Sequence, residues 1–441
     1  MAEIAETGEK YGELIVLGYN GLNAMMKNRA CRSKFELLKR DTPNGIAKSR
    51  HYVVGNARHY QQKKRLHSVM YTLNRHQMVV VEYVPDNKTD MFQIGRSSEE
   101  QIDFTVMDTW LGRSFLNSGI RNGDNPPQST ISRYACRILI HRKPPYEARV
   151  YAAGFDSCRN IFLGVCIYYC FFFLKLLRIA IVKCFLETFY FKERATKWRK
   201  ESGELDGLTT NGILILHPQK SPESSLYAWY EVSVDGDLFA LRPTRSTPHR
   251  GEKVETQSNV LQDGTLIDLC GATLLYRTSY GLAESPTSAE LEGILNQLNA
   301  GRPQCPVNLN TLIIPKQKSV LPDSPEKQPY VYLTCGHVQG YHSWGHSRET
   351  LMHICPICKT ESSDIVQLCM GMEPAFHLDS GKLDHAFIPC GHMASSKTVR
   401  YWSRIPLPHG TSSFHPVCPF CTVLLSPKKP FVKLIFQDNC F

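Results

Sequence analysis

The feature that most restricts the fold of this chain is a pair of similar cysteine–histidine units in its C-terminal part. Each unit has a C-G-H triplet followed by a C-P-x-C tetrad, and so supplies three thiolates and one imidazole. Zinc is bound tetrahedrally by four such ligands, so the two units predict two structural zinc ions, Zn2+. A small domain of this kind folds around its metal because it lacks a large core. The eight predicted ligands are Cys335, His337, Cys355, Cys358, Cys390, His392, Cys418 and Cys421.

The spacing leaves open how these ligands divide between the two ions. In one arrangement each unit binds one ion. In the other, the two C-G-H triplets share one ion and the two C-P-x-C tetrads share the other, which is the cross-brace of RING domains. Protein ligands fill all eight positions, so none is open for the water of a hydrolytic zinc enzyme. Gln339 and Ala394 stand where the H-x-E motif of zinc deaminases needs its glutamate. The module is therefore predicted to dock other proteins.

The N-terminus and the charge bear on compartment and partners. Residues 1–10 carry three glutamates and no apolar run, which predicts no secretory signal and a reducing, cytoplasmic location. More than half of the 16 cysteines lie between Cys305 and Cys440, and in a reducing compartment this crowding favours metal binding over disulfides. The net charge of +10 is scattered, which predicts a solvated surface, with an acidic or phosphorylated partner as the sharper interpretation.

The chain before the cysteine-rich part is patterned as short strands separated by Gly, Asp, Asn and Pro, which favours an antiparallel sandwich or barrel. A helix is predicted at 287–301, where Thr287 and Glu290 form a capping box. The stretches 19–75 and 105–130 look like insertions or long loops. The expected strands are 11–20, 78–84, 137–141, 147–153, 212–217, 227–234 and 265–275.

Residues 161–174 form an uncharged apolar run followed at once by charged residues. The run is shorter than the roughly 20 apolar residues of a membrane-spanning helix. We interpret it as part of an insertion that is foreign to the fold, with a buried element and a membrane-surface segment as the alternatives.

Several blocks of the sequence resemble the Pellino family over nearly the whole chain. They include YGELIVLGYNG at 11–21, STISRYACRI at 129–138, DGLTTNG at 206–212, LQDGTLIDLCGATLLYRT at 261–278, CGHVQGYHSWGH at 335–346 and IPCGHMASSKTVRYWSRIPLPHGT at 388–411. The resemblance implies a mainly β fold: an FHA-type antiparallel β-sandwich with an added wing, followed by a small α+β zinc-binding RING-like domain. The implied boundaries are 11–280 for the sandwich and wing, 287–301 for a connecting helix and 302–441 for the RING-like domain, with 165–192 as a hydrophobic insertion.

The resemblance also implies a function, that of a RING-type E3 ubiquitin-protein ligase in Toll and interleukin-1 receptor type innate immune signalling. Such a ligase works by docking, and no residue of its own is catalytic. The implied partners are a ubiquitin-conjugating enzyme, ubiquitin and phosphorylated receptor-associated kinases. Neither nucleic acid nor membrane contact is expected. The alternatives are a non-enzymatic phosphopeptide-binding scaffold with a purely structural zinc module and, less favoured, a form tethered to a membrane through residues 165–191.

The family's motifs also imply roles for individual residues, and at two positions this chain departs from common FHA and RING motifs. Ala135 stands where many FHA domains have a histidine, a departure that Pellino proteins share. Thr422 follows the last predicted ligand, so the basic residue that pins ubiquitin in many RING domains stays unassigned. The candidates for the surface that docks the conjugating enzyme are Pro356, Ile357 and Pro419. The residues implied in binding a phosphothreonine peptide are Arg96, Ser132, Arg133, Thr210 and Asn211.

Overall fold

The computed structural model describes residues 9–19, 33–55, 66–74, 76–107, 129–163, 196–218, 227–244, 247–301, 303–317, 327–345, 352–409 and 413–437. Contacts divide the chain into two units: the first runs as far as Thr278, and the second comprises Tyr227 and the residues from Ser279 onward. The predicted insertion at 165–192 lies outside the described residues. Within the described ranges, no helix is long and apolar enough to cross a membrane.

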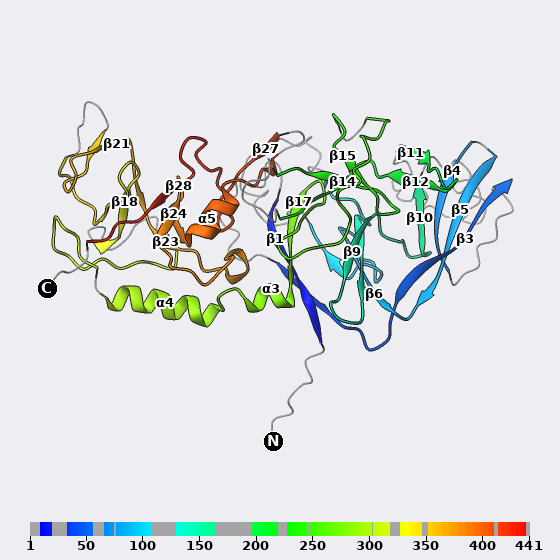
Figure 1. The fold of residues 1–441 in the computed structure, drawn as a ribbon, viewed down its shortest axis with the longest axis horizontal. Coiled ribbons are helices and arrows are strands. Elements are labelled where there is room, and N and C mark those ends of the chain that lie inside the picture. The colour runs from blue at the N-terminus through cyan, green and yellow to red at the C-terminus, as the bar shows by residue number, and fades with distance from the viewer. Residues whose placement is uncertain are drawn as a thin grey trace, which may run out of the picture. The chain divides into compact units, whose positions relative to one another are not determined.

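The first unit is built from strands, which confirms the predicted mainly β fold class (Figure 1). Its strands are β1 (Lys10–Tyr19), β2 (Lys34–Leu38), β3 (Gly45–Gly55), β4 (His67–Thr72), β5 (Gln77–Asp86), β6 (Thr89–Gly95), β7 (Phe104–Thr105), β8 (Cys136–His141), β9 (Ala148–Ala152), β10 (Asn160–Leu163), β11 (Thr196–Arg199), β12 (Leu205–Leu208), β13 (Ile213–Leu216), β14 (Tyr230–Val232), β15 (Leu238–Ala240), β16 (Leu266–Asp268) and β17 (Ala272–Thr278).

A seven-stranded sheet in the order β15-β14-β13-β16-β17-β1-β2 forms one layer of the sandwich. The first and last strands of the unit lie side by side in it, blue β1 against green β17 in Figure 1, with Leu14 opposite Tyr276. A four-stranded sheet in the order β7-β6-β8-β9 contributes Phe92 and Ile138, which face each other across β6 and β8. Side chains of both sheets are buried in one hydrophobic cluster, so this shared core holds the sandwich together.

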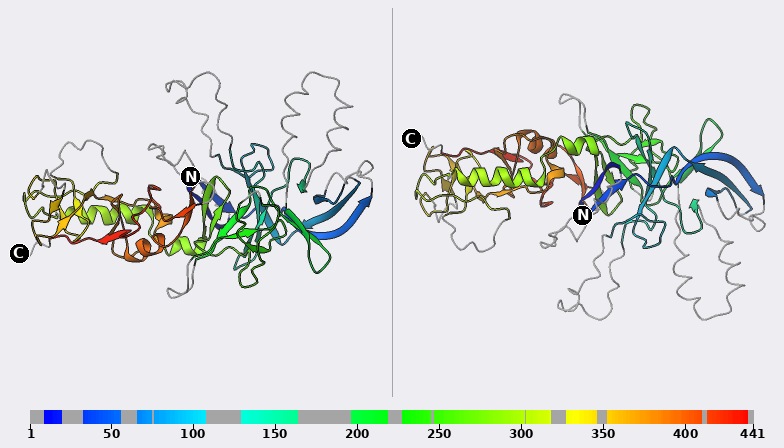
Figure 2. Two further views of the ribbon diagram at one scale, coloured as in Figure 1. Left: turned by 90° about the horizontal axis from the view of Figure 1, so that it is seen from above. Right: turned by 90° about the horizontal axis from the view of Figure 1, so that it is seen from below.

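A third sheet, β10-β4-β5-β3, forms the wing that the resemblance predicts. Its blue strands run side by side and curve away from the sandwich in both views of Figure 2. The stretch 19–75 was predicted to be an insertion or a long loop, and the loop alternative was wrong for the residues of β2, β3 and β4. The outer strand β3 exposes residues 47–51, so its polar sequence lacks the alternation that marks a half-buried strand. The start of the apolar run, Ile161 to Leu163, lies in β10 and pairs in parallel with β4.

The predicted strand 265–275 is two strands, because a tight turn interrupts it. Asp268 causes the break: its carboxylate accepts hydrogen bonds from the Cys270 N–H at 3.1 Å and from the Thr273 hydroxyl at 3.1 Å. Cys270 takes a φ of 72°, in the left-handed region, and the chain reverses into β17. The sequence did not indicate this short Asx-type turn, because apolar residues surround it on both sides.

The second unit combines short strands with short helices, as predicted for a small α+β domain. Its elements are α3 (Ser279–Ala283), α4 (Ser288–Ala300), β18 (Tyr330–Tyr332), β19 (Val338–Gln339), β20 (His353–Ile354), β21 (Glu361–Ser362), β22 (Ile365–Gln367), β23 (Cys369–Met370), the 3-10 helix η5 (Pro374–Phe376), β24 (His385–Phe387), β25 (His392–Ala394), α5 (Ser396–Trp402), β26 (Leu407–His409), β27 (Ser413–His415) and β28 (Phe431–Lys433).

Helix α4 begins with the predicted capping box. Thr287 accepts a hydrogen bond from the Glu290 N–H, and the Glu290 carboxylate accepts one from the Thr287 N–H. Leu291 and Leu295 are buried in a hydrophobic cluster that also contains Val331 and Met393. The apolar stripe of the helix is therefore covered by strands of the second unit, which makes α4 part of the core of that unit.

Candidate functional site

Two tight turns bring the cysteines of each C-P-x-C tetrad together. At Cys355 the N–H donates to the Thr360 carbonyl at 2.9 Å, and the Lys359 N–H donates back to the Cys355 carbonyl at 2.8 Å. Lys359 takes a φ of 58°, which closes the turn and directs both sulfurs to one side. The turn at Cys418 repeats this pattern, with Thr422 at a φ of 60°. The C-P-x-C spacing thus encodes a local turn that needs no distant contact.

The C-G-H triplets depend on glycine. Gly336 has a φ of 86°, and a Cβ on it would lie 2.2 Å from the Lys433 carbonyl oxygen. Gly391 has a φ of 67°, and its Cβ would lie 2.3 Å from the Gln367 carbonyl oxygen. Only glycine combines this backbone conformation with so close an approach. The histidine that follows each glycine lies at a strand start: His392 begins β25, and His337 stands directly before β19.

The fold gathers the eight predicted ligands into two clusters, and each cluster contains one complete sequence unit. In both, every ligand atom lies within 4.8 Å of the others. The clusters are Cys335, His337, Cys355 and Cys358, and Cys390, His392, Cys418 and Cys421. The spacing allowed two ways to divide the ligands. In the structure, each pair of a C-G-H triplet and the C-P-x-C tetrad after it forms its own cluster, and the interleaved cross-brace is not formed.

The donor atoms of these clusters fit a tetrahedral zinc ion. His337 Nδ1 lies 3.3 Å from Cys335 Sγ and 3.7 Å from Cys355 Sγ, and His392 Nδ1 lies 3.8 Å from Cys418 Sγ. Bond lengths of about 2.1 Å to nitrogen and 2.3 Å to sulfur place the edges of such a tetrahedron at roughly 3.5–3.8 Å. Three thiols and one imidazole are also the ligand chemistry of structural zinc sites.

Protonation of the thiols opposes metal binding. Burial raises the pKa of the Cys335 thiol to about 12. The Thr360 hydroxyl, hydrogen-bonded to Cys358, lowers the pKa of that thiol to about 6. A metal ion at this cluster must displace the proton of the Cys335 thiol, so its affinity falls as the pH falls.

One residue beside the first cluster was missed by sequence reasoning. Gln339 Nε2 donates to Cys355 Sγ at 3.3 Å, and its Oε1 lies 2.8 Å from His342 Nε2. Such a second layer of hydrogen bonds orients a metal ligand and stabilises its thiolate. The only sequence signal was the position of Gln339 two residues after His337.

The two C-P-x-C turns differ in what they present to solvent. Ile357 is 43% exposed in the first turn, and Lys359 Nζ of the same turn lies 4.4 Å from the ring centroid of the exposed Trp344. In the second turn, Phe420 stacks on His392 at 5.7 Å, and Pro419 is buried. Of the three residues predicted for docking, Ile357 is therefore exposed, Pro356 is half-buried and Pro419 is covered.

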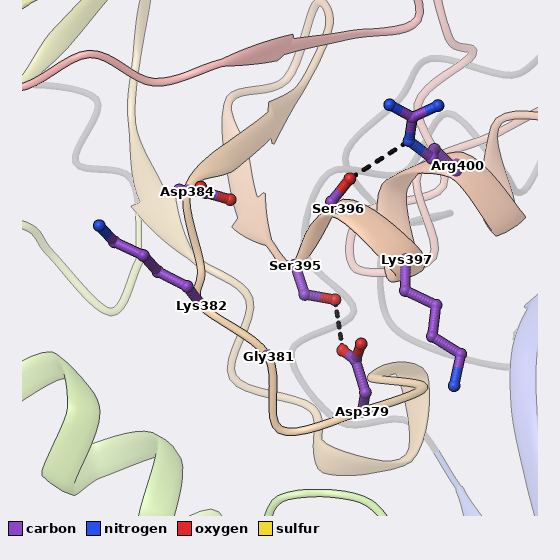
Figure 3. Close-up of a pocket in the computed structure, with 8 residues that line it drawn as sticks. All are labelled: Asp379, Gly381, Lys382, Asp384, Ser395, Ser396, Lys397 and Arg400. Atoms are coloured by element: carbon purple, nitrogen blue, oxygen red, sulfur yellow. Dashed lines mark hydrogen bonds between the residues drawn. The ribbon is translucent and has the colours of Figure 1, made fainter.

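The second unit also contains an open cavity of about 550 Å³ (Figure 3). Its lining includes the side chains of Lys382, Lys397 and Arg400, with Asp379 accepting a hydrogen bond from Ser395 Oγ at 2.5 Å. Ser395 also caps α5, so this bond ties a loop to the start of that helix. No cysteine or histidine lines the cavity, and it is separate from both cysteine–histidine clusters.

In the first unit, loops from three parts of the chain bring Arg96, Ser132 and Asn211 together. The Arg96 N–H donates to the Ser132 carbonyl at 3.1 Å, and its Nε donates to the Ile131 carbonyl at 2.8 Å. Within the described residues, the two terminal nitrogens of Arg96 have no hydrogen-bond partner. Asn211 Nδ2 donates to Ser132 Oγ at 3.1 Å and to the Thr130 carbonyl at 2.8 Å. Guanidinium, hydroxyl and amide groups thus converge at one place.

The other two predicted residues are placed differently. Thr210 precedes Asn211 in the same turn, and its buried hydroxyl has no hydrogen-bond partner in the part of the chain that the structure describes. Arg133 turns to Glu99 and forms an ion pair with it. Partial burial opposes ionisation of Glu99, but hydrogen bonding from Tyr134 and the charge of Arg133 outweigh it, so the pKa of Glu99 lies below its usual range. Arg133 is therefore already paired.

A β-sandwich with a polar loop site, followed in the chain by a module with two separate Cys3His clusters, is the combination that the resemblance implies: an FHA-type domain and a RING-like domain. The family model described as "Pellino, FHA domain" matches residues 3–167 and 186–294, and "Pellino, RING domain" matches residues 298–441. "Protein pellino" of Drosophila melanogaster is 48% identical over 438 residues, which cover 98% of this chain and 93% of that protein.

Two vertebrate relatives agree with these matches. "E3 ubiquitin-protein ligase pellino homolog 2" of Homo sapiens is 48% identical over 97% of this chain and 95% of that protein. "E3 ubiquitin-protein ligase pellino homolog 3" of Mus musculus is 46% identical, over 97% of this chain and 90% of that protein. The chain belongs to the Pellino family of E3 ubiquitin-protein ligases, as the resemblance predicted.

Proposed function

We propose that this chain recognises phosphothreonine-containing proteins through its FHA domain and promotes ubiquitin transfer from a conjugating enzyme through its RING-like domain. The observation that supports the second part most directly is the pair of complete ligand sets, of which the first presents the exposed apolar residue Ile357 between the two cysteines of its C-P-x-C tetrad. A closed zinc site leaves no position for bound water, so the module acts by holding partners in place.

The eight cysteines and histidines of the two clusters would hold two zinc ions, whose contribution is structural. Each ion would fix one C-P-x-C turn against its C-G-H triplet, and so fix the direction in which Ile357 and Pro356 face. A conjugating enzyme docked there keeps its ubiquitin thioester in a reactive geometry for an incoming lysine. The protein supplies orientation, and no side chain of this chain forms a covalent bond with ubiquitin.

The FHA part would select the substrate. A phosphothreonine carries up to two negative charges, which the free terminal nitrogens of Arg96 and the Ser132 hydroxyl would bind by charge-assisted hydrogen bonds. Asn211 would hold the peptide backbone, with Thr210 beside it. Arg133 would contribute once it leaves Glu99. Phosphorylated receptor-associated kinases of Toll and interleukin-1 receptor type signalling, in the cytoplasm, are the proposed partners.

We also propose the domain limits stated from the sequence. The FHA-like sandwich and wing occupy 11–280, a helix follows at 287–301, and the RING-like domain occupies 302–441. The two stretches that match the FHA family model leave out residues 168–185, which supports the proposal of an insertion at 165–192.

An in vitro ubiquitination assay with a panel of conjugating enzymes tests the proposal. The intact chain is expected to build ubiquitin chains, and the double variant Cys355→Ala/Cys358→Ala is expected to lose both this activity and one of two bound zinc ions. If the intact chain binds two zinc ions but is inactive with every conjugating enzyme, the transferase proposal is wrong. A non-enzymatic phosphopeptide-binding scaffold would then be the better description.

A further inference from the structure

The residues proposed to hold the peptide backbone lie in a short turn between β12 and β13. The Gly212 N–H donates to the Thr209 carbonyl at 3.2 Å, which closes the turn around Thr210 and Asn211. Gly212 has a φ of 69°, in the left-handed region. The turn therefore places Asn211 where its amide reaches Ser132 and Thr130.

A buried ion pair lies directly under this turn. Arg242 and Glu231 have side chains that are 2% and 3% exposed, and Arg242 donates to both carboxylate oxygens, at 2.6 and 2.9 Å. The same guanidinium donates to the Thr209 carbonyl at 3.0 Å and, through Nη1, to the Thr247 carbonyl at 3.1 Å. Glu231 lies on β14, opposite Leu214 of β13. The pair thus joins the turn to the sheet.

The contact between turn and pair is close. A Cβ on Gly212 would lie 2.5 Å from Glu231 Oε1 and 3.6 Å from Arg242 Nη2. Arg242 and the Gly212 N–H share the Thr209 carbonyl as acceptor, so the direction of this carbonyl is fixed from two sides. A rotation of the Thr209 peptide would break both hydrogen bonds and would move Asn211 away from Ser132.

Stability alone is a poor reason for this arrangement. Taking an ion pair out of water costs free energy that its own attraction repays only with very good geometry, and well-packed apolar residues often stabilise a core as well. What apolar residues cannot do is hold a carbonyl in a fixed direction. A side chain with a rigid, multidentate donor set can do so.

We propose that Arg242 and Glu231 are positioning residues of the phosphopeptide site. They do not touch the ligand, and they act by holding the turn Thr209–Gly212, and with it Asn211, in the binding conformation. This inference rests on the proposed phosphopeptide-binding function. It assigns to two residues outside the family's recognition motif a role in affinity, through preorganisation of the site.

The test compares full-length variants binding a degenerate phosphothreonine peptide pool and the same pool without phosphate. Arg242→Met is expected to weaken binding of the phosphorylated pool about tenfold, because a binding-competent turn populated about one tenth of the time raises the apparent Kd by that factor. Glu231→Gln keeps the size and the acceptor oxygen of the side chain, so a smaller loss is expected. If Arg242→Met fails to fold, the affinity of Glu231→Gln for the phosphorylated pool tests the proposal instead.

The matched control is Arg277→Met. Arg277 is another buried arginine, on β17 of the sheet that contains Glu231, and it pairs with Asp263 at 3.0 Å. This variant is expected to lower the melting temperature but to keep wild-type affinity at a temperature where it is folded. Salt gives a second readout. Arg96→Ala, which removes a contact to phosphate, should flatten the salt dependence of binding, whereas Arg242→Met should keep the wild-type salt dependence at lower affinity.

The outcomes separate the two ideas. If the wild-type chain does not prefer the phosphorylated pool, the proposed phosphopeptide function is wrong, and the inference falls with it. If the wild-type chain does prefer it, while the Arg242 and Glu231 variants bind as tightly as Arg277→Met, only the inference is overturned. A loss of affinity confined to the Arg242 and Glu231 variants, with unchanged salt dependence, supports it.

Discussion

Replacing Ile357 by alanine is expected to weaken docking of a conjugating enzyme by a factor that follows from its exposure. Full burial of an isoleucine side chain stabilises by about 1.5–3 kcal/mol. Since 43% of Ile357 is exposed, docking can bury at most that fraction. The loss is therefore at most about 0.6–1.3 kcal/mol, which corresponds to an affinity weaker by a factor of up to roughly three to nine. The discharge of ubiquitin from the conjugating enzyme to free lysine, measured below saturation, should slow by the same factor.

The chain provides a matched control for this experiment. Leu424 is 44% exposed and follows the C-P-x-C tetrad Cys418–Cys421, so Leu424→Ala removes a similar apolar area beside the other cluster. Both variants should retain two zinc ions, because neither residue is a ligand. Leu424→Ala should discharge ubiquitin at the wild-type rate. Equal effects of the two substitutions, or no effect of Ile357→Ala, would refute the assignment of docking to the first turn.

Three further predictions concern other parts of the molecule. Glu99→Gln should tighten phosphothreonine-peptide binding about twofold to fivefold at low salt, because it releases Arg133; fluorescence anisotropy measures this. Gly336→Ala should reduce bound zinc from two ions to one in metal analysis, because its Cβ would lie 2.2 Å from a carbonyl oxygen. Burial lowers the pKa of His67 to about 4, so only the unfolded chain binds this proton between about pH 6.5 and 4. The free energy of opening β4, measured by amide hydrogen exchange, should therefore fall by at most about 3 kcal/mol as the pH drops through that window. In His67→Gln this free energy should depend less on pH.

The cysteine–histidine clusters were predictable residue by residue because their geometry is local. The C-P-x-C turn and the C-G-H triplet each form from a few consecutive residues, and the structure realises both twice. The partition of the ligands was not predictable, because it depends on how the strands of the second unit pair. The different orientations of Ile357 and Phe420 were hidden too, since both are apolar residues at the same motif position.

The phosphopeptide site could not be predicted from local sequence, in contrast to the ligand motifs of the clusters. Arg96, Ser132 and Asn211 were implied by family motifs, but their convergence depends on contacts over long sequence separations. Nothing in the sequence indicated that Glu99 pairs with Arg133, or that a buried arginine supports the Thr209–Gly212 turn. The polar edge strand β3 was missed for a related reason: an edge strand exposed on both faces has no alternation to detect.

A third turn of the zinc-binding type explains how the second unit divides its stability between metal and core. At Cys305 the N–H donates to the Asn310 carbonyl at 2.9 Å, the Leu309 N–H donates to the Cys305 carbonyl at 2.9 Å, and Leu309 has a φ of 55°. These are the bonds and the conformation of the two C-P-x-C turns, yet Asn308 stands where the second cysteine would be. The Cys305 sulfur accepts hydrogen bonds from two backbone N–H groups and is buried in the cluster that includes Leu295. Apolar packing by α4 thus performs at this turn the task that a metal ion is expected to perform at the other two.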